Sequence, residues 1–117
     1  MQHVRVDRSS HGPVLVLGVS GELDVSAADA VVAALVEHAP TAPATDVALD
    51  LSGCTFLDSG GSRAVIGVCR ELRERGHRVA LVAPPSTGNV RRVLDVIGVA
   101  RLLPVVDALE DLPIDER

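Results

Sequence analysis

The residues with the clearest chemical potential lie between positions 52 and 62, where a carboxylate, two serine hydroxyls and two adjacent glycines follow one another: Asp58, Ser59, Gly60, Gly61 and Ser62. Asp58 comes just before an apolar helical pattern, so it is suited to cap a helix by accepting the amide of Gly60 or Gly61. Each glycine in a first turn weakens a helix by up to about 1 kcal/mol relative to Ala. We interpret the glycines as giving another molecule close access to the helix start, and a tight turn that requires glycine is the alternative.

An enzyme is one function to consider, because Ser59, His77 and a carboxylate could supply a nucleophile, a base and an orienting acid. However, no Gly-x-Ser-x-Gly motif surrounds Ser59, and His77 falls in a predicted turn after the helix. No metal-ligand spacing is present, and Cys54 and Cys69 match no zinc or redox spacing. We therefore expect no enzymatic activity, no cofactor and no metal, with both cysteines in the core.

The composition limits the partners of this 117-residue chain. It is 47% hydrophobic and 23% charged, as expected of one soluble domain over residues 1–117. Its net charge is -5, its basic residues are all Arg, and its one aromatic residue is Phe56. Base stacking and phosphate binding are both disfavoured, so we expect no nucleic-acid partner. The sequence has neither a secretory leader nor an apolar run of the roughly 20 residues that span a bilayer, which predicts a cytoplasmic protein without a membrane partner.

Alternating strand and helix patterns must position these residues. The predicted strands are His3–Val6, Val14–Val19, Val47–Leu51, Arg78–Ala83 and Leu102–Val106. The predicted helices run from a cap at Ser26 to Ala39, from Ser59 to Gly76, from Ser86 or Thr87 to Gly98, and briefly from Asp107. Residues 8–13 form the predicted turn of an amino-terminal hairpin, strand 47–51 packs chiefly on one face, and strand 78–83 is covered on both faces.

This alternation predicts an α/β fold with a parallel-containing sheet and helices packed against it. Functional sites in such folds lie where strands end and helices begin. The segment from Leu51 to Ser62 is therefore the predicted functional region.

Three segments resemble STAS domains: Gly21–Asp24, Phe56–Gly61 and Val90–Leu94. In particular, the chain resembles bacterial anti-sigma factor antagonists over about residues 4–112. The resemblance implies a mixed sheet of about five strands backed by helices. It also implies binding to an anti-sigma factor, commonly an ATP-dependent serine protein kinase, so that a sigma factor is released and transcription is regulated.

The resemblance breaks down at Gly60. In the family, Asp-Ser is followed by Ser or Thr, whose hydroxyl the kinase phosphorylates, and then by Gly; here Gly60 takes the phosphoacceptor position. The implied partner-binding residues are Asp24, Asp58, Ser59, Gly60, Gly61 and Ser62, with Asp24 near the same end of the sheet. We expect binding without the usual switch, with Ser59 as the more plausible residual phosphoacceptor and Ser62 as the less plausible one.

Gly60→Ser is expected to restore phosphorylation, and to fold without harm unless Gly60 has a positive φ, because Ser is the better helix residue. The alternative function is a STAS-type sensor or scaffold whose glycine-rich helix start binds a nucleotide or another small anion without a phosphorylation switch. The identity of the anti-sigma factor and the oligomeric state, a homodimer included, are left open.

Overall fold

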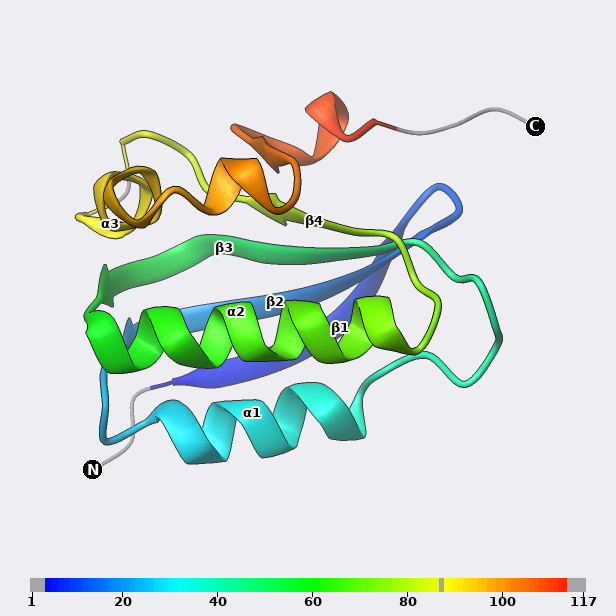
Figure 1. The fold of residues 1–117 in the computed structure, drawn as a ribbon, viewed down its shortest axis with the longest axis horizontal. Coiled ribbons are helices and arrows are strands. Elements are labelled where there is room, and N and C mark those ends of the chain that lie inside the picture. The colour runs from blue at the N-terminus through cyan, green and yellow to red at the C-terminus, as the bar shows by residue number, and fades with distance from the viewer. Residues whose placement is uncertain (1–3, 87, 114–117) are drawn as a thin grey trace.

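The computed structural model describes residues 4–86 and 88–113, which form a five-stranded mixed sheet with helices packed against it (Figure 1). In chain order the elements are β1 (Arg5–His11), β2 (Val14–Leu23), α1 (Ala28–Glu37), β3 (Val47–Leu57), α2 (Ser59–Glu74), β4 (Val79–Val82), α3 (Val90–Ile97), the 3-10 helix η1 (Val99–Arg101), β5 (Val105–Val106) and the 3-10 helix η2 (Leu109–Asp111). The strands lie in the order β1-β2-β3-β4-β5. The predicted α/β class is confirmed.

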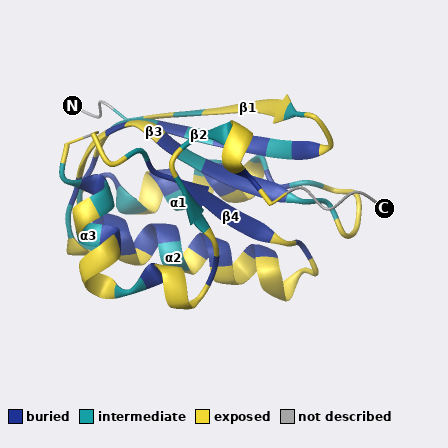
Figure 2. Ribbon diagram, turned by 90° about the horizontal axis from the view of Figure 1, so that it is seen from above, coloured by how far each residue is buried: buried dark blue, intermediate teal, exposed yellow. Residues whose placement is uncertain are grey.

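β1 and β2 form the predicted amino-terminal hairpin, and the remaining neighbours in the sheet are parallel. The turn is shorter than predicted, because His11 already pairs with Val14 and leaves only Gly12 and Pro13 between the strands. Residues 8–11 looked like a turn because they are polar. They are compatible with a strand because β1 is an exposed edge strand (Figure 2). His3 lies outside the described residues.

The main core lies between the sheet and the three α-helices, which Figure 2 shows on one side of the strands. A smaller cluster covers the opposite face, where Ala48 packs with Val16, Val82 and Leu112. The prediction that strand 47–51 packs chiefly on one face is therefore wrong, since Ala48, on the other face, is fully buried. A period-two pattern cannot reveal that the carboxyl-terminal segment folds back over the second face. β4 is buried at all four positions, as predicted.

β3 continues six residues beyond its predicted end at Leu51 and stops at Leu57, directly before Asp58. The polar side chains that suggested a loop, such as Ser52 and Thr55, face solvent while the backbone stays paired with β2. Leu23, the last residue of β2, lies opposite Leu57. The residues that follow these two strands are therefore brought to the same edge of the sheet.

Several element ends differ from the predictions. α1 begins at Ala28 rather than at Ser26, and the side chain of Ala27 provides no cap. α3 begins at Val90, after Asn89; of its two predicted caps, Thr87 lies outside the described residues. α3 ends at Ile97, which is 46% exposed, and the following residue, Gly98, has a φ of 75°.

The carboxyl-terminal elements are shorter than predicted. The last strand covers only Val105–Val106, because η1 and the following turn take up the residues before it. The segment after Asp107 forms the single 3-10 turn of η2. No helix in the described part of the chain is both long and apolar enough to cross a membrane.

Candidate functional site

Asp58 joins the end of β3, the start of α2 and the loop that follows β2. Its Oδ1 accepts the Gly61 amide at 2.8 Å, which confirms the predicted helix cap. Its Oδ2 accepts the Val25 amide at 3.0 Å. One carboxylate therefore caps the helix and holds the neighbouring loop against it.

Asp24 organises that loop in a similar way. Its Oδ1 accepts the Ser26 hydroxyl at 2.6 Å and the Ala27 amide at 3.0 Å. The Ser26 hydroxyl, followed by the Ala27 amide, lowers the pKa of the Asp24 carboxyl from its usual value. Asp24 thus begins the turn into α1, in the role that the sequence suggested for Ser26. It lies at the same edge of the sheet as Asp58, as expected.

The residues after Asp58 differ greatly in exposure. Ser59, the first residue of α2, is exposed, whereas Gly61 is buried and Ser62 is only 3% exposed. The Ser62 hydroxyl donates to the Asp58 carbonyl oxygen at 2.8 Å. A Cβ atom on Gly61 would lie 2.0 Å from the Leu23 carbonyl oxygen, so no side chain fits there. In this conformation Gly61 and Ser62 lie beneath the surface at the start of α2 and are not part of it.

Gly60 lies directly beneath Val25. A Cβ atom at position 60 would lie 2.7 Å from the Val25 Cβ and 2.8 Å from its Cα, closer than such atoms normally approach. Gly60 is not among the glycines with positive φ. The expectation that Gly60→Ser folds without harm is therefore wrong. The reason is packing against a residue 35 positions earlier in the sequence, and not helix propensity.

The segment before α3 supports the same edge of the sheet. The Asn89 side chain accepts the Leu57 amide through Oδ1 and donates to the Leu57 carbonyl oxygen through Nδ2, both at 2.9 Å. Gly88, with a φ of 47°, lies so close to β3 that a Cβ would be 2.1 Å from the Thr55 carbonyl oxygen. These contacts hold the end of β3 immediately before Asp58.

Sequence reasoning did not identify Val25 or Asn89 as site residues. The available signal for Val25 was one apolar residue within the polar turn Asp24–Ser26. The signal for Asn89 was that this amide side chain directly precedes Val90, the first apolar residue of α3, whereas the predicted cap Ser86 lies three residues earlier. Neither signal indicates which distant residue is contacted.

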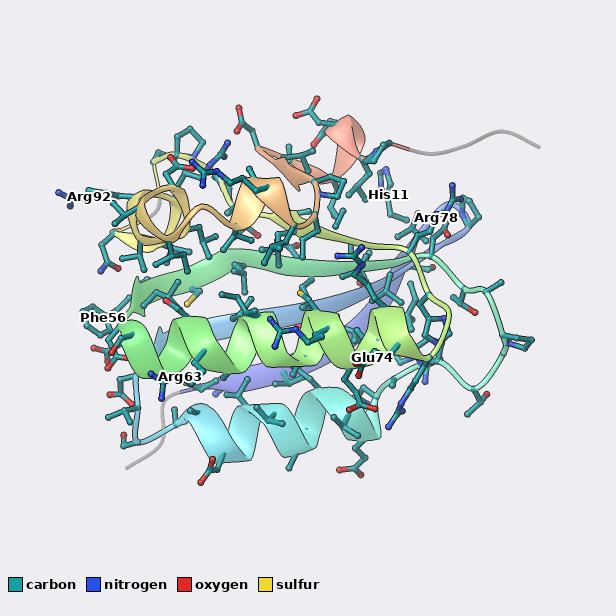
Figure 3. All side chains as sticks on the ribbon, viewed as in Figure 1. His11, Phe56, Arg63, Glu74, Arg78 and Arg92 are labelled. Atoms are coloured by element: carbon teal, nitrogen blue, oxygen red, sulfur yellow. The ribbon has the colours of Figure 1, made fainter. Side chains whose placement is uncertain are left out.

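Ser59 and His77 do not form a catalytic pair. α2 has 16 residues, so its ends are about 24 Å apart, and His77 follows the end opposite Ser59. The His77 Nδ1 lies 3.0 Å from the Thr45 carbonyl oxygen. His77 also lines a hollow of about 470 Å³ that lies at the beginnings of β3 and β4, with Val47 and Val79 among its walls. This hollow and the start of α2 are at opposite ends of the parallel strands. Figure 3 shows Arg78, which lines the hollow, at one end of the molecule and Phe56, near the start of α2, at the other.

The fold and this helix start together define the class of protein. A model of one protein family, described as "Mlab, STAS domain", matches residues 4–105, which is most of the chain. The chain therefore belongs to the STAS domain family. The resemblance based on three short segments is confirmed.

The most similar proteins include several anti-sigma factor antagonists. The anti-sigma F factor antagonist of Paenibacillus polymyxa is 28% identical over 107 residues, which cover 90% of this chain and 88% of that protein. The crystal structure of an anti-sigma factor antagonist from Mycobacterium paratuberculosis has a TM-score of 0.72 at 28% identity, covering 92% of this chain and 89% of the other. The antagonist SpoIIAA in its unphosphorylated form has a TM-score of 0.58 at 26% identity, with 92% and 91% covered.

Proposed function

We propose that this chain is an anti-sigma factor antagonist that binds an anti-sigma factor of the serine-kinase type, so that a sigma factor is released and transcription is regulated. The observation that carries the proposal is the start of α2. There Asp58 holds the helix and the loop after β2 in one arrangement, with Ser59 exposed between them. The similarity to antagonists over nine-tenths of the chain supports the same function. In this proposal the chain acts in the cytoplasm and is not an enzyme.

We further propose that the usual phosphorylation switch is absent. Gly60 has no hydroxyl, and the Ser62 hydroxyl is buried against the Asp58 carbonyl oxygen. Ser59 is exposed, but on a helix it points about 100° away from position 60. In the usual switch, a phosphate at position 60 would add about 1.5 to 2 negative charges beside Asp58 and obstruct close docking. Without this modification, binding would be controlled by the amounts of the two proteins.

The alternative of an anion sensor at the same helix start has less support. The amides of Gly61 and Ser62 already donate to Asp58, one to its carboxylate and one to its carbonyl oxygen, both at 2.8 Å. The carboxylates of Asp58 and Asp24 also repel an approaching phosphate. We therefore favour a protein partner over a nucleotide.

Binding to a panel of purified anti-sigma kinases, measured by calorimetry, tests the proposal. Ser59→Glu should weaken binding at least tenfold, because its longer side chain obstructs close docking at the centre of the docking surface. Gly67→Glu is the matched control: it adds the same charge to α2, about 12 Å further along, where a Cβ meets no other atom within 4 Å. If no anti-sigma factor binds the native chain, the proposed function is wrong.

The absence of the switch is tested separately by mass spectrometry after incubation of the native chain with a bound kinase and ATP. We expect no stoichiometric phosphate on the native chain. Full modification of Ser59 or Ser62 would show that the switch has moved along the chain and has not been lost.

A further inference from the structure

Val25 is an unusual member of the loop between β2 and α1. Val25 is 72% exposed, and it is apolar whereas its neighbours Asp24 and Ser26 are polar. Single exposed apolar residues are common and need no explanation by themselves. What distinguishes Val25 is how firmly it is held.

Two interactions of Val25 and a hydrogen bond in the turn that follows it hold its backbone in place. Its amide donates to the Asp58 carboxylate at 3.0 Å, and the Asp24 carboxylate closes the turn that follows by accepting the Ala27 amide. The space between Val25 and Gly60 is too small for a side chain at position 60, since a Cβ there would lie 2.7 Å from the Val25 Cβ and 2.9 Å from its Cγ2. Val25 therefore occupies the space that a side chain at position 60 would need.

A residue whose backbone is already held in place loses less conformational entropy when a partner covers it. Val25 contacts the first turn of α2 next to Ser59, so a protein that docks on Ser59 must also meet Val25. Two carboxylates lie near Val25, because that of Asp58 accepts the Val25 amide and that of Asp24 accepts the Ala27 amide in the same loop. The complementary partner surface would combine an apolar recess with positive charge.

We infer that Val25, seated on Gly60, is the apolar anchor through which this chain binds its anti-sigma factor. The inference rests on the proposed function and names a residue that the family motif does not include. Glycine at position 60 then has two effects. It lacks the hydroxyl that a kinase would phosphorylate, and it leaves room for the loop that carries Val25.

The binding test compares Val25→Ser with Val36→Ser against an anti-sigma kinase that binds the native chain. Val36 is the control because it is also exposed and lies near the carboxyl end of α1, whereas Val25 precedes the amino end. We expect Val25→Ser to lose at least tenfold in affinity and Val36→Ser less than twofold, with urea denaturation confirming that both variants are folded. Affinity of Val25→Ser within twofold of native overturns the inference and leaves the proposed function intact. No binding of the native chain to any anti-sigma factor overturns the proposed function.

The seating of Val25 on Gly60 is tested without a partner. Gly60→Ala should lower the urea midpoint, and should lower it less when Val25 is replaced by Gly, because the Val25 Cβ and Cγ2 are then gone and only its Cα still crowds position 60. Gly67→Ala, in the same helix but in open space, should show no such dependence on residue 25. Equal penalties of Gly60→Ala in both backgrounds would show that Val25 does not rest on Gly60 in solution and would overturn the inference.

Discussion

Glycines of one helix have different roles in this protein. Gly60 and Gly61 are in the first turn of α2 and pack against the loop after β2 and against the Leu23 carbonyl, respectively. Gly67, two turns later, is exposed and has open space around it. Tertiary contacts therefore decide whether adding a methyl group at a given position of this helix is costly.

Replacing Gly61 by Ala should reduce the free energy of unfolding by about 3 kcal/mol or more, because the new Cβ meets a backbone oxygen that cannot easily move. Gly67→Ala should instead increase it by about 0.5 to 1 kcal/mol, since Ala is the better helix residue. Urea denaturation of both variants measures the difference. Similar effects of the two substitutions would contradict the close packing of Gly61.

At the scale of elements, α3 is attached to the sheet by polar contacts at its start. Asn89 bonds both backbone groups of Leu57, and Arg91 donates through Nη1 to the Ala83 carbonyl oxygen and to Asp107, each at 2.7 Å. The hydrogen bond with Asp107 raises the pKa of Arg91. Arg91 thereby links α3 to the ends of β4 and β5. Its neighbour Arg92 is exposed and extends outward (Figure 3).

Arg91→Ala should lower the free energy of unfolding by about 1 to 2 kcal/mol, because it removes charge-assisted hydrogen bonds and leaves the Ala83 carbonyl without this donor. Arg92→Ala should change it by less than about 0.5 kcal/mol, as is usual at exposed positions. Chemical denaturation at low and at high salt measures the free energy of unfolding of both variants. An equal effect of both substitutions would exclude the linking role of Arg91.

At the scale of the whole molecule, the core is aliphatic and includes two free thiols. Cys54 and Cys69 are buried, as predicted, and lie in the main cluster. Burial raises the pKa of both thiols, that of Cys69 to about 12. Neither thiol is suited to act as a nucleophile at neutral pH.

The unfolded chain loses the Cys69 proton from about pH 9, whereas the folded chain holds it to about pH 12. The contribution of Cys69 to stability is therefore complete below pH 9 and is lost as the pH rises towards 12, by up to about 1.4 kcal/mol per pH unit. The sequence has no Lys or Tyr to titrate in this range. Urea denaturation from pH 8 to 11 should show this decline, with a shallower slope for Cys69→Ala. Rapid labelling of the native protein by a thiol reagent at pH 8 would contradict the burial.

The sequence by itself determined the order of strands and helices, the start of α2 at Ser59, the capping role of Asp58 and the missing hydroxyl at position 60. These features depend on residue types within a few positions of one another, so hydrophobic periodicity and capping preferences suffice to predict them. The full length of β3 could not be predicted, because its polar half resembles a loop until β2 is seen to pair with it.

Only the tertiary structure decided which site residues reach the surface. Ser62 and Gly61 are enclosed, while Val25, which no local pattern distinguished, is held in the exposed position by Asp58, 33 residues away. Asn89 reaches Leu57 across 32 residues. Such contacts depend on how two loops meet at one edge of the sheet, and that geometry follows from the strand register and the packing of α1 and α2, which no single segment of the sequence contains.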